Sequence, residues 1–103
     1  MSIWNRIVGK GSGKPLALTL YTRARCPLCD EMKAEIARAD LKRLGVRPEL
    51  RVVDIDGDPS LVERHGRSVP VLEIEGRVAF KGHLTAGELE RRVARALRER
   101  EPA

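Results

Sequence analysis

The chain contains two cysteines, Cys26 and Cys29, and only Pro27 and Leu28 separate them. Two intervening residues allow the sulfurs to meet and close a short disulfide. An almost wholly apolar run, residues 16–21, precedes the pair and is typical of a buried strand. The residues from Pro27 onward favour a helix, whose first turn does not need the N–H that proline lacks. The pattern predicts a redox-active cysteine pair at the junction of a strand and a helix.

The predicted helix start gives the two sulfurs different roles. A helix N-terminus presents unpaired N–H groups and about half a positive charge, which stabilise a thiolate and lower the pKa of its thiol. Arg23 and Arg25 add positive charge nearby. We therefore expect Cys26, at the exposed tip, to attack a substrate disulfide. Cys29, one turn inside the helix, would then resolve the mixed disulfide.

Two other roles for the cysteines fit the sequence less well. A zinc site takes four ligands, and one cysteine pair supplies two of them. His65 and His83 follow Cys29 by 36 and 54 residues, far from any zinc-finger spacing, so we expect no metal site. Each histidine is expected to be a solvated residue of a loop or helix end. A purely structural disulfide between residues 26 and 29 would close too short a loop to restrict the unfolded chain much.

Composition and charge exclude several classes to which the protein could belong. A length of 103 residues suits one small domain, and 42% hydrophobic residues are too many for wholesale disorder. The net charge of +5 lies within residues 1–25, which hold five basic and no acidic residues, while the remainder balances 15 basic against 15 acidic residues. Aromatic residues make up only 3%, so a stacking platform for nucleic acid is not expected. We also expect no secretory signal, no membrane span and no disulfide scaffold.

Hydrophobic periodicity and turn residues predict the remaining elements. Strands are expected at residues 16–21, 50–55, 69–74 and 77–80, and helices at 27–44, 59–65 and 86–97. The first helix carries two apolar groups, so it is either covered on two sides or bent near Asp40. Glu75-Gly76 is expected to turn a hairpin. The order β-α-β-α-β-β-α, with helices on both faces, predicts an α/β three-layer sandwich.

The last predicted helix has the clearest start signal. Thr85 and Glu88 have capping-box spacing, and Leu84 and Leu89 fit the hydrophobic staple around it. One face of the helix is apolar and should pack on the sheet. The other face is expected to be solvated and carries Glu90, Arg91, Arg95 and Arg98.

Residues 1–15 are expected to form a flexible basic arm ahead of a domain that spans residues 16–103. The stretch from Gly9 to Pro15 is rich in glycine and ends in proline, which favours a flexible tether. Trp4 lies in a brief apolar patch of this arm. We expect its ring to dock on the protein, because a wholly solvated tryptophan is unusual.

With the cysteine motif placed in a β-α-β frame, the chain resembles the thioredoxin-like superfamily and most of all its small glutaredoxin-like members. The resemblance covers residues 16–97. It rests on four segments, which are the strand that leads into Cys26-Pro27-Leu28-Cys29, the second strand Val52–Asp56, the Ser68-Val69-Pro70 element, and Phe80-Lys81-Gly82 before the last helix.

The resemblance implies a thioredoxin-like fold with a four-stranded mixed sheet and a cis peptide bond at Pro70 beside the cysteines. The backbone of Val69 would then pair with an extended substrate segment. Glutathione-using glutaredoxins hold the glutamyl end with acidic or Ser/Thr-Asp residues after a glycine turn. The corresponding stretch here is Gly82–Thr85, which has no acidic residue. Arginine can hold a carboxylate through its planar fork, so Arg23 and Arg25 are candidate contacts for a thiol or peptide partner, with Val69, Pro70 and Gly82.

The expected function is that of a cytoplasmic thiol–disulfide oxidoreductase, an enzyme that needs no cofactor beyond a thiol reductant. Glutathione is one candidate reductant. The expected partners are a disulfide-containing protein or a low-molecular-weight thiol and a reductase or thiol electron donor, with the enzyme a monomer that binds neither nucleic acid nor membrane. Two alternatives stay open. The chain could carry iron–sulfur or another metal through Cys26, or it could be a non-catalytic binding module that keeps the fold.

Overall fold

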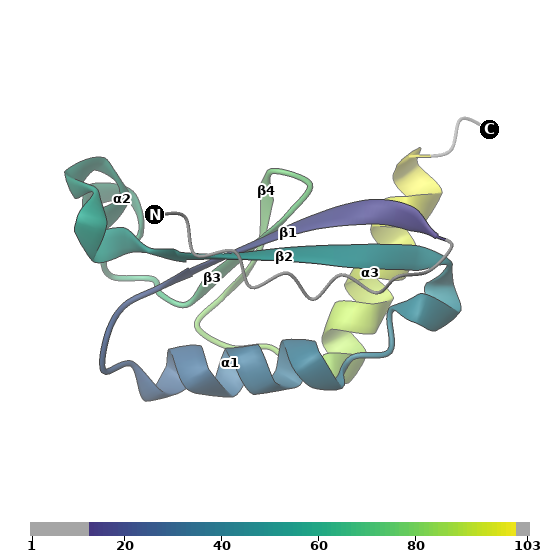
Figure 1. Ribbon diagram of the computed structural model, residues 1–103, viewed down its shortest axis with the longest axis horizontal. Coiled ribbons are helices and arrows are strands. Elements are labelled where there is room, and N and C mark those ends of the chain that lie inside the picture. The colour runs from purple at the N-terminus through teal and green to yellow at the C-terminus, as the bar shows by residue number, and fades with distance from the viewer. Residues whose placement is uncertain (1–12, 101–103) are drawn as a thin grey trace.

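The computed structural model describes residues 13–100, and their elements follow the predicted order (Figure 1). The strands are β1 (Lys14–Thr22), β2 (Val46–Asp54), β3 (Val71–Ile74) and β4 (Arg77–Lys81). The helices are α1 (Pro27–Arg38), α2 (Pro59–His65) and α3 (Ala86–Arg100), with short 3-10 turns at Lys42–Leu44 and Ile55–Gly57. Within this part of the chain, no helix is long and apolar enough to cross a bilayer.

The four strands form one mixed sheet in the order β2-β1-β3-β4. β1 and β2 are parallel, with Leu18 opposite Leu50, and the crossover between them contains α1. β3 is antiparallel to both β1 and β4. The hairpin between β3 and β4 turns at Glu75 and Gly76, which both have positive φ, as a two-residue hairpin turn requires. β2 and β4 are therefore the two edge strands.

Alternation along β1 separates two faces of the sheet. Leu16, Leu18 and Leu20 are at most 1% exposed and point to the face that α1 and α3 cover. The opposite face is covered at one end by α2, where the ring of His65 packs against that of Tyr21. Helices thus lie on both faces, and the predicted three-layer α/β class is confirmed.

The first helix is shorter than we predicted. It ends at Arg38 rather than at Leu44, because Ala39 adopts an extended conformation and the chain resumes as a separate 3-10 turn. The break lets Leu41, which is 4% exposed, join the core beside the apolar side of α1. Of the two arrangements that the apolar pattern allowed, the chain therefore takes the bend near Asp40.

The strand boundaries also differ from the prediction. β1 begins at Lys14, so two residues that we assigned to the arm belong to the sheet, and the rest of the predicted arm lies outside the described residues apart from Gly13. β2 begins at Val46, four residues earlier than expected. Residues 69 and 70 precede β3 rather than forming its start, and the peptide bond between them is cis.

The start of α3 has the capping box that we predicted, but one residue of its outer face is not solvated as we expected. The Thr85 amide donates to Glu88 Oε1 at 2.8 Å, and the Glu88 amide donates to Thr85 Oγ1 at 3.1 Å, which completes the capping box. Glu90 was expected to be solvated, yet its carboxylate accepts from the Asp40 amide at 3.0 Å and pairs with Arg43. These contacts hold the pKa of Glu90 below its usual range and tie the break after α1 to α3.

Candidate functional site

Cys26 and Cys29 are joined by a disulfide, with their Cα atoms 5.2 Å apart. Cys26 is partly exposed, whereas Cys29 is 1% exposed and faces the core from the first turn of α1. The structure therefore brings the two predicted catalytic residues together. Only the first of them is open to a substrate.

The start of α1 holds the sulfur of Cys26 against one backbone donor, the N–H of Cys29. Cys26 is the N-cap residue, and its Sγ accepts from the Cys29 amide at a distance of 3.1 Å. Its carbonyl accepts from the Asp30 amide at 3.2 Å. Pro27 is the first helical residue and has no N–H to satisfy. The same Cys29 N–H also donates to the Cys26 carbonyl at 3.0 Å, so it is shared between that oxygen and the sulfur on which negative charge forms when the disulfide is reduced.

The two arginines before the pair occupy different environments. Arg23 is bound to the carboxylate of Asp56, with Nη2 2.6 Å from Oδ1, and its Nη1 donates to the Gly66 carbonyl at 3.2 Å. The bond from Arg23 holds the pKa of Asp56 below its usual range. Arg25 is exposed and has a φ of 56° in the left-handed region, immediately before Cys26. Arg23 therefore braces the loop after β1, and Arg25 is the arginine presented to solvent.

The loop before β3 contains a cis peptide bond between Val69 and Pro70, as the family resemblance implied. It lies at the same end of the sheet as the cysteines, because β3 begins at Val71 opposite Tyr21, near the end of β1. Pro70 is buried, and its carbonyl accepts from the Gly82 amide at 2.7 Å.

Our expectation that the Val69 backbone is free to pair with a substrate is wrong for its amide. The Val69 N–H donates to the His65 carbonyl at 3.1 Å, and the Ser68 N–H donates to the same oxygen at 2.8 Å. The C-terminal end of α2 therefore fixes this loop. The Val69 carbonyl is the group left to accept a hydrogen bond from an extended peptide.

His65 is the residue that sequence reasoning missed. It lies at a helix end, as expected, but it is only 6% exposed, and its ring lies 4.6 Å from the ring of Tyr21 between centroids. Its Nε2 has no hydrogen-bond partner. Burial, with a smaller contribution from Arg64, lowers the pKa of His65. His83, by contrast, is exposed as predicted.

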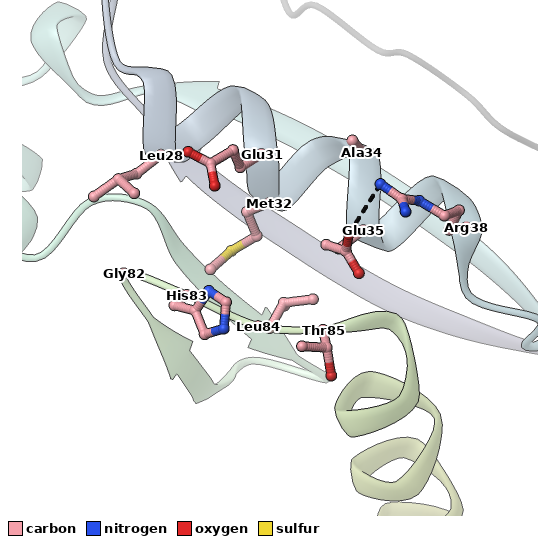
Figure 2. Close-up of a pocket in the computed structure, with 10 residues that line it drawn as sticks. All are labelled: Leu28, Glu31, Met32, Ala34, Glu35, Arg38, Gly82, His83, Leu84 and Thr85. Carbon is pink, nitrogen blue, oxygen red and sulfur yellow. Dashed lines mark ion pairs between the residues drawn. The ribbon is translucent and has the colours of Figure 1, made fainter.

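A pocket of about 240 Å³ lies between α1 and the segment that leads into α3 (Figure 2). Leu28, which is 49% exposed, lies at one end, and Met32 projects from α1 toward the segment of residues 82–85. At the other end Glu35 pairs with Arg38, and its Oε1 accepts from the Ala86 amide at 2.9 Å. Carboxylates of the chain itself therefore already accept hydrogen bonds from the amides of Thr85 and Ala86 at the start of α3.

Among residues 13–100 the structure contains no group of three or more His, Cys, Asp or Glu side chains placed to hold a metal ion. The cysteine pair has no third potential ligand beside it in this part of the chain. The chemistry that the described geometry supports most directly is exchange between thiols and disulfides.

Comparisons with known proteins agree with this geometry. The family described as Glutaredoxin-like domain (DUF836) matches residues 17–94. The X-ray structure of target protein XcR50 from X. campestris is 32% identical, with a TM-score of 0.57, and the match covers 82% of this chain and 99% of that one. Thioredoxin-2 of a malaria parasite is 19% identical with a TM-score of 0.57, over 87% of this chain and 99% of that one, and shows the shared fold. The comparison with curated proteins found no match. The chain therefore belongs to the glutaredoxin-like domain family and has a thioredoxin-like fold.

Proposed function

We propose that the protein is a thiol–disulfide oxidoreductase in which Cys26 is the nucleophile and Cys29 the resolving thiol. The observation that carries this proposal is the disulfide at the N-terminus of α1, with Cys26 Sγ accepting from the Cys29 amide. On reduction the same N–H would stabilise a thiolate at Cys26 and lower the pKa of that thiol. The burial of Cys29 keeps the second sulfur away from solvent and within bonding reach of the first.

The proposed reaction is two successive exchanges. The Cys26 thiolate attacks one sulfur of a substrate disulfide, a new S–S bond forms as the substrate bond breaks, and the leaving thiolate takes a proton from water. Cys29 then loses its proton to solvent and attacks Cys26 Sγ, which releases the second substrate sulfur as a thiolate. Two electrons have passed to the substrate, and the cysteine pair is oxidised. One dithiol, or two molecules of a low-molecular-weight thiol, returns two electrons by the reverse exchange and leaves as a disulfide.

The surroundings of the pair favour a protein disulfide over glutathione as the substrate. In relatives that use glutathione, the region around the start of the last helix holds its glutamyl end. Here Glu35 and Glu88 already bind the amides of Ala86 and Thr85 at that position. Arg23 is bound to Asp56 and is not presented to a ligand. Exposed Leu28, between the cysteines, offers apolar surface to a polypeptide instead. We place the cycle in a reducing compartment such as the cytoplasm, where thiols keep the pair reduced.

The test is turnover of a protein disulfide, with dithiothreitol as the reductant. Because Cys26 and Cys29 are the only cysteines in the chain, each serine variant leaves one thiol. Cys26→Ser should abolish turnover, and Cys29→Ser should accumulate a mixed disulfide of protein plus substrate, seen as an intact mass that dithiothreitol reverses. The double variant is the matched control and should give neither product. Full turnover by Cys26→Ser would end the proposal.

A further inference from the structure

A second cavity lies at the C-terminal end of α1, away from the cysteine pair at its N-terminal end. It is an apolar groove of about 340 Å³ between α1 and the edge strand β2. Its lining includes Leu18 and Leu50 from the strands and Ile36, Ala37 and Leu41 from α1 and the break after it. Of the nine residues that line it, Asp40 and Lys42 are the only charged ones. Nothing in the redox cycle uses this groove.

The chain itself contains an apolar segment of matching character. Residues 1–12, which the structure does not describe, include Ile3, Trp4, Ile7 and Val8 within six positions. A glycine-rich stretch, residues 9–13, connects this segment to β1. The segment is basic, and Arg6 between its apolar residues complements Asp40 in the groove lining.

The point where the segment enters the fold lies beside the groove. The Lys14 amide donates to the Gly45 carbonyl at 3.1 Å, so residue 14 is held next to the start of β2. Pro48 and Leu50 of the groove lie two and four residues further along β2 from Val46, or about 7–13 Å at the usual rise per residue. The five residues of the glycine-rich tether can span up to about 17 Å. The tether is therefore long enough for the apolar residues before it to reach the groove.

We propose that the N-terminal segment docks into this groove of its own chain, with Trp4 as the main apolar side chain buried there. A tryptophan carries about 150–250 Å² of surface, most of it apolar. A short glycine-rich tether gives the segment an effective concentration in the millimolar range beside the groove, which favours it over a separate partner. Docking would cover the apolar part of the groove lining and leave the cysteines, at the N-terminal end of α1, accessible.

The chain provides its own probe, because Trp4 is its single tryptophan. The full-length protein should show blue-shifted tryptophan emission and acrylamide quenching several-fold weaker than that of N-acetyltryptophanamide. Both values should be unchanged on dilution, since the contact is within one chain. Emission and quenching equal to those of the free compound would overturn the proposal. Protection that disappears on dilution, together with a dimer in sedimentation, would assign the groove to a second copy and would also overturn it.

Paired substitutions on α1 locate the docking site. Ala37 and Ala34 are both exposed on this helix, but Ala37 lines the groove and Ala34 lines the pocket on the other side. Ala37→Arg should raise acrylamide quenching to the level of the free compound, and Ala34→Arg should leave it unchanged. Ile7→Asp tests the same contact from outside the described fold and should also release Trp4. If Trp4 stays protected from acrylamide quenching in both Ala37→Arg and Ile7→Asp, the docking of the N-terminal segment in this groove is refuted.

Discussion

His65 makes the folding stability of the protein depend on pH between about 7.5 and 5.5. Its imidazole is 6% exposed, and burial is the largest cause that lowers its pKa. Arg64 and Lys81 act in the same direction, and the carboxylate of Glu73 acts against them. A base whose pKa is lower in the folded state than its ordinary value near 6.5 binds fewer protons folded than unfolded. The stabilisation is therefore complete above the unfolded pKa and is lost as the pH falls below it.

The size of the effect follows from one imidazole. The change in unfolding free energy between pH 7.5 and 5.5 has an upper limit of about 1.4 kcal/mol, which one imidazole reaches only when the unfolded ring titrates near 6.5 and the folded ring takes up no proton in this range. With a urea m-value of about 1–3 kcal/mol per molar, the unfolding midpoint should be lower at pH 5.5 than at pH 7.5, by no more than about 0.5–1.4 M. The assay is urea unfolding of the oxidised protein followed by far-UV circular dichroism at pH 7.5, 6.5 and 5.5.

A substitution separates the contribution of His65 to the pH dependence of stability from that of carboxylates that titrate at lower pH. His65→Phe keeps a ring against Tyr21 and removes the unpartnered Nε2, so it should unfold at nearly the same urea concentration at pH 7.5 and 5.5. His83→Phe changes the exposed histidine and should retain the pH dependence of the natural protein. The reasoning is refuted if the midpoint shift between pH 7.5 and 5.5 is the same in His65→Phe as in the natural protein.

Three further predictions concern the packing of α1 and α3 and the choice of substrate. Met32→Ala should lower the unfolding free energy by about 2–5 kcal/mol in urea titrations, because the Met32 side chain is 1% exposed. Leu28→Ala, on the exposed side of α1, should change the unfolding free energy by under about 0.5 kcal/mol. Equal losses in the two variants would contradict the packing described. Thr85→Ala removes the N-cap of α3 and should cost about 0.5–2 kcal/mol in the same assay, and an unchanged midpoint would show that the capping box is not formed in solution. Glu35→Ala frees the amide of Ala86, the first residue of α3, and should raise turnover with glutathione about tenfold or more, since a hydrogen bond to a charged group contributes about 1.5–3 kcal/mol. Glu31→Ala is the control and should leave this turnover unchanged. An equal gain in both variants would show that loss of negative charge alone explains the effect.

Local signals in the sequence were sufficient for most of the fold. The alternation and turn residues predicted all seven elements in order, and the capping box at Thr85 and Glu88 placed the start of α3. The break after Arg38 was not resolved, because it depends on the Asp40 amide finding the carboxylate of Glu90, a residue fifty positions away. A local pattern of helix-forming residues contains no information about such a partner.

In the candidate site too, features that depend on local sequence could be predicted, and features that depend on long-range contacts could not. The pairing of Cys26 with Cys29 at the start of α1, on which their proposed roles rest, follows from a spacing of two residues and a helix start, which are local features. The burial of His65 depends on Tyr21 lying beneath it on the sheet, and the pairing of Arg23 depends on Asp56 at the end of β2. Both are long-range contacts. The cis bond at Pro70 was expected only from the family resemblance, because nothing in the local sequence distinguishes it from an ordinary trans proline at a strand edge.

The most direct test is the ionisation of Cys26 in the reduced Cys29→Ser variant, which retains the amide that donates to Cys26 Sγ and has one thiol. The rate of alkylation by iodoacetamide is followed by intact mass spectrometry at a series of pH values from 4 to 10. The pH at which this rate reaches half its maximum gives the pKa of the thiol. A reactive nucleophile at a helix start predicts a midpoint well below that of free cysteine, about 8.5. A midpoint at or above that of free cysteine would contradict the proposed role of Cys26.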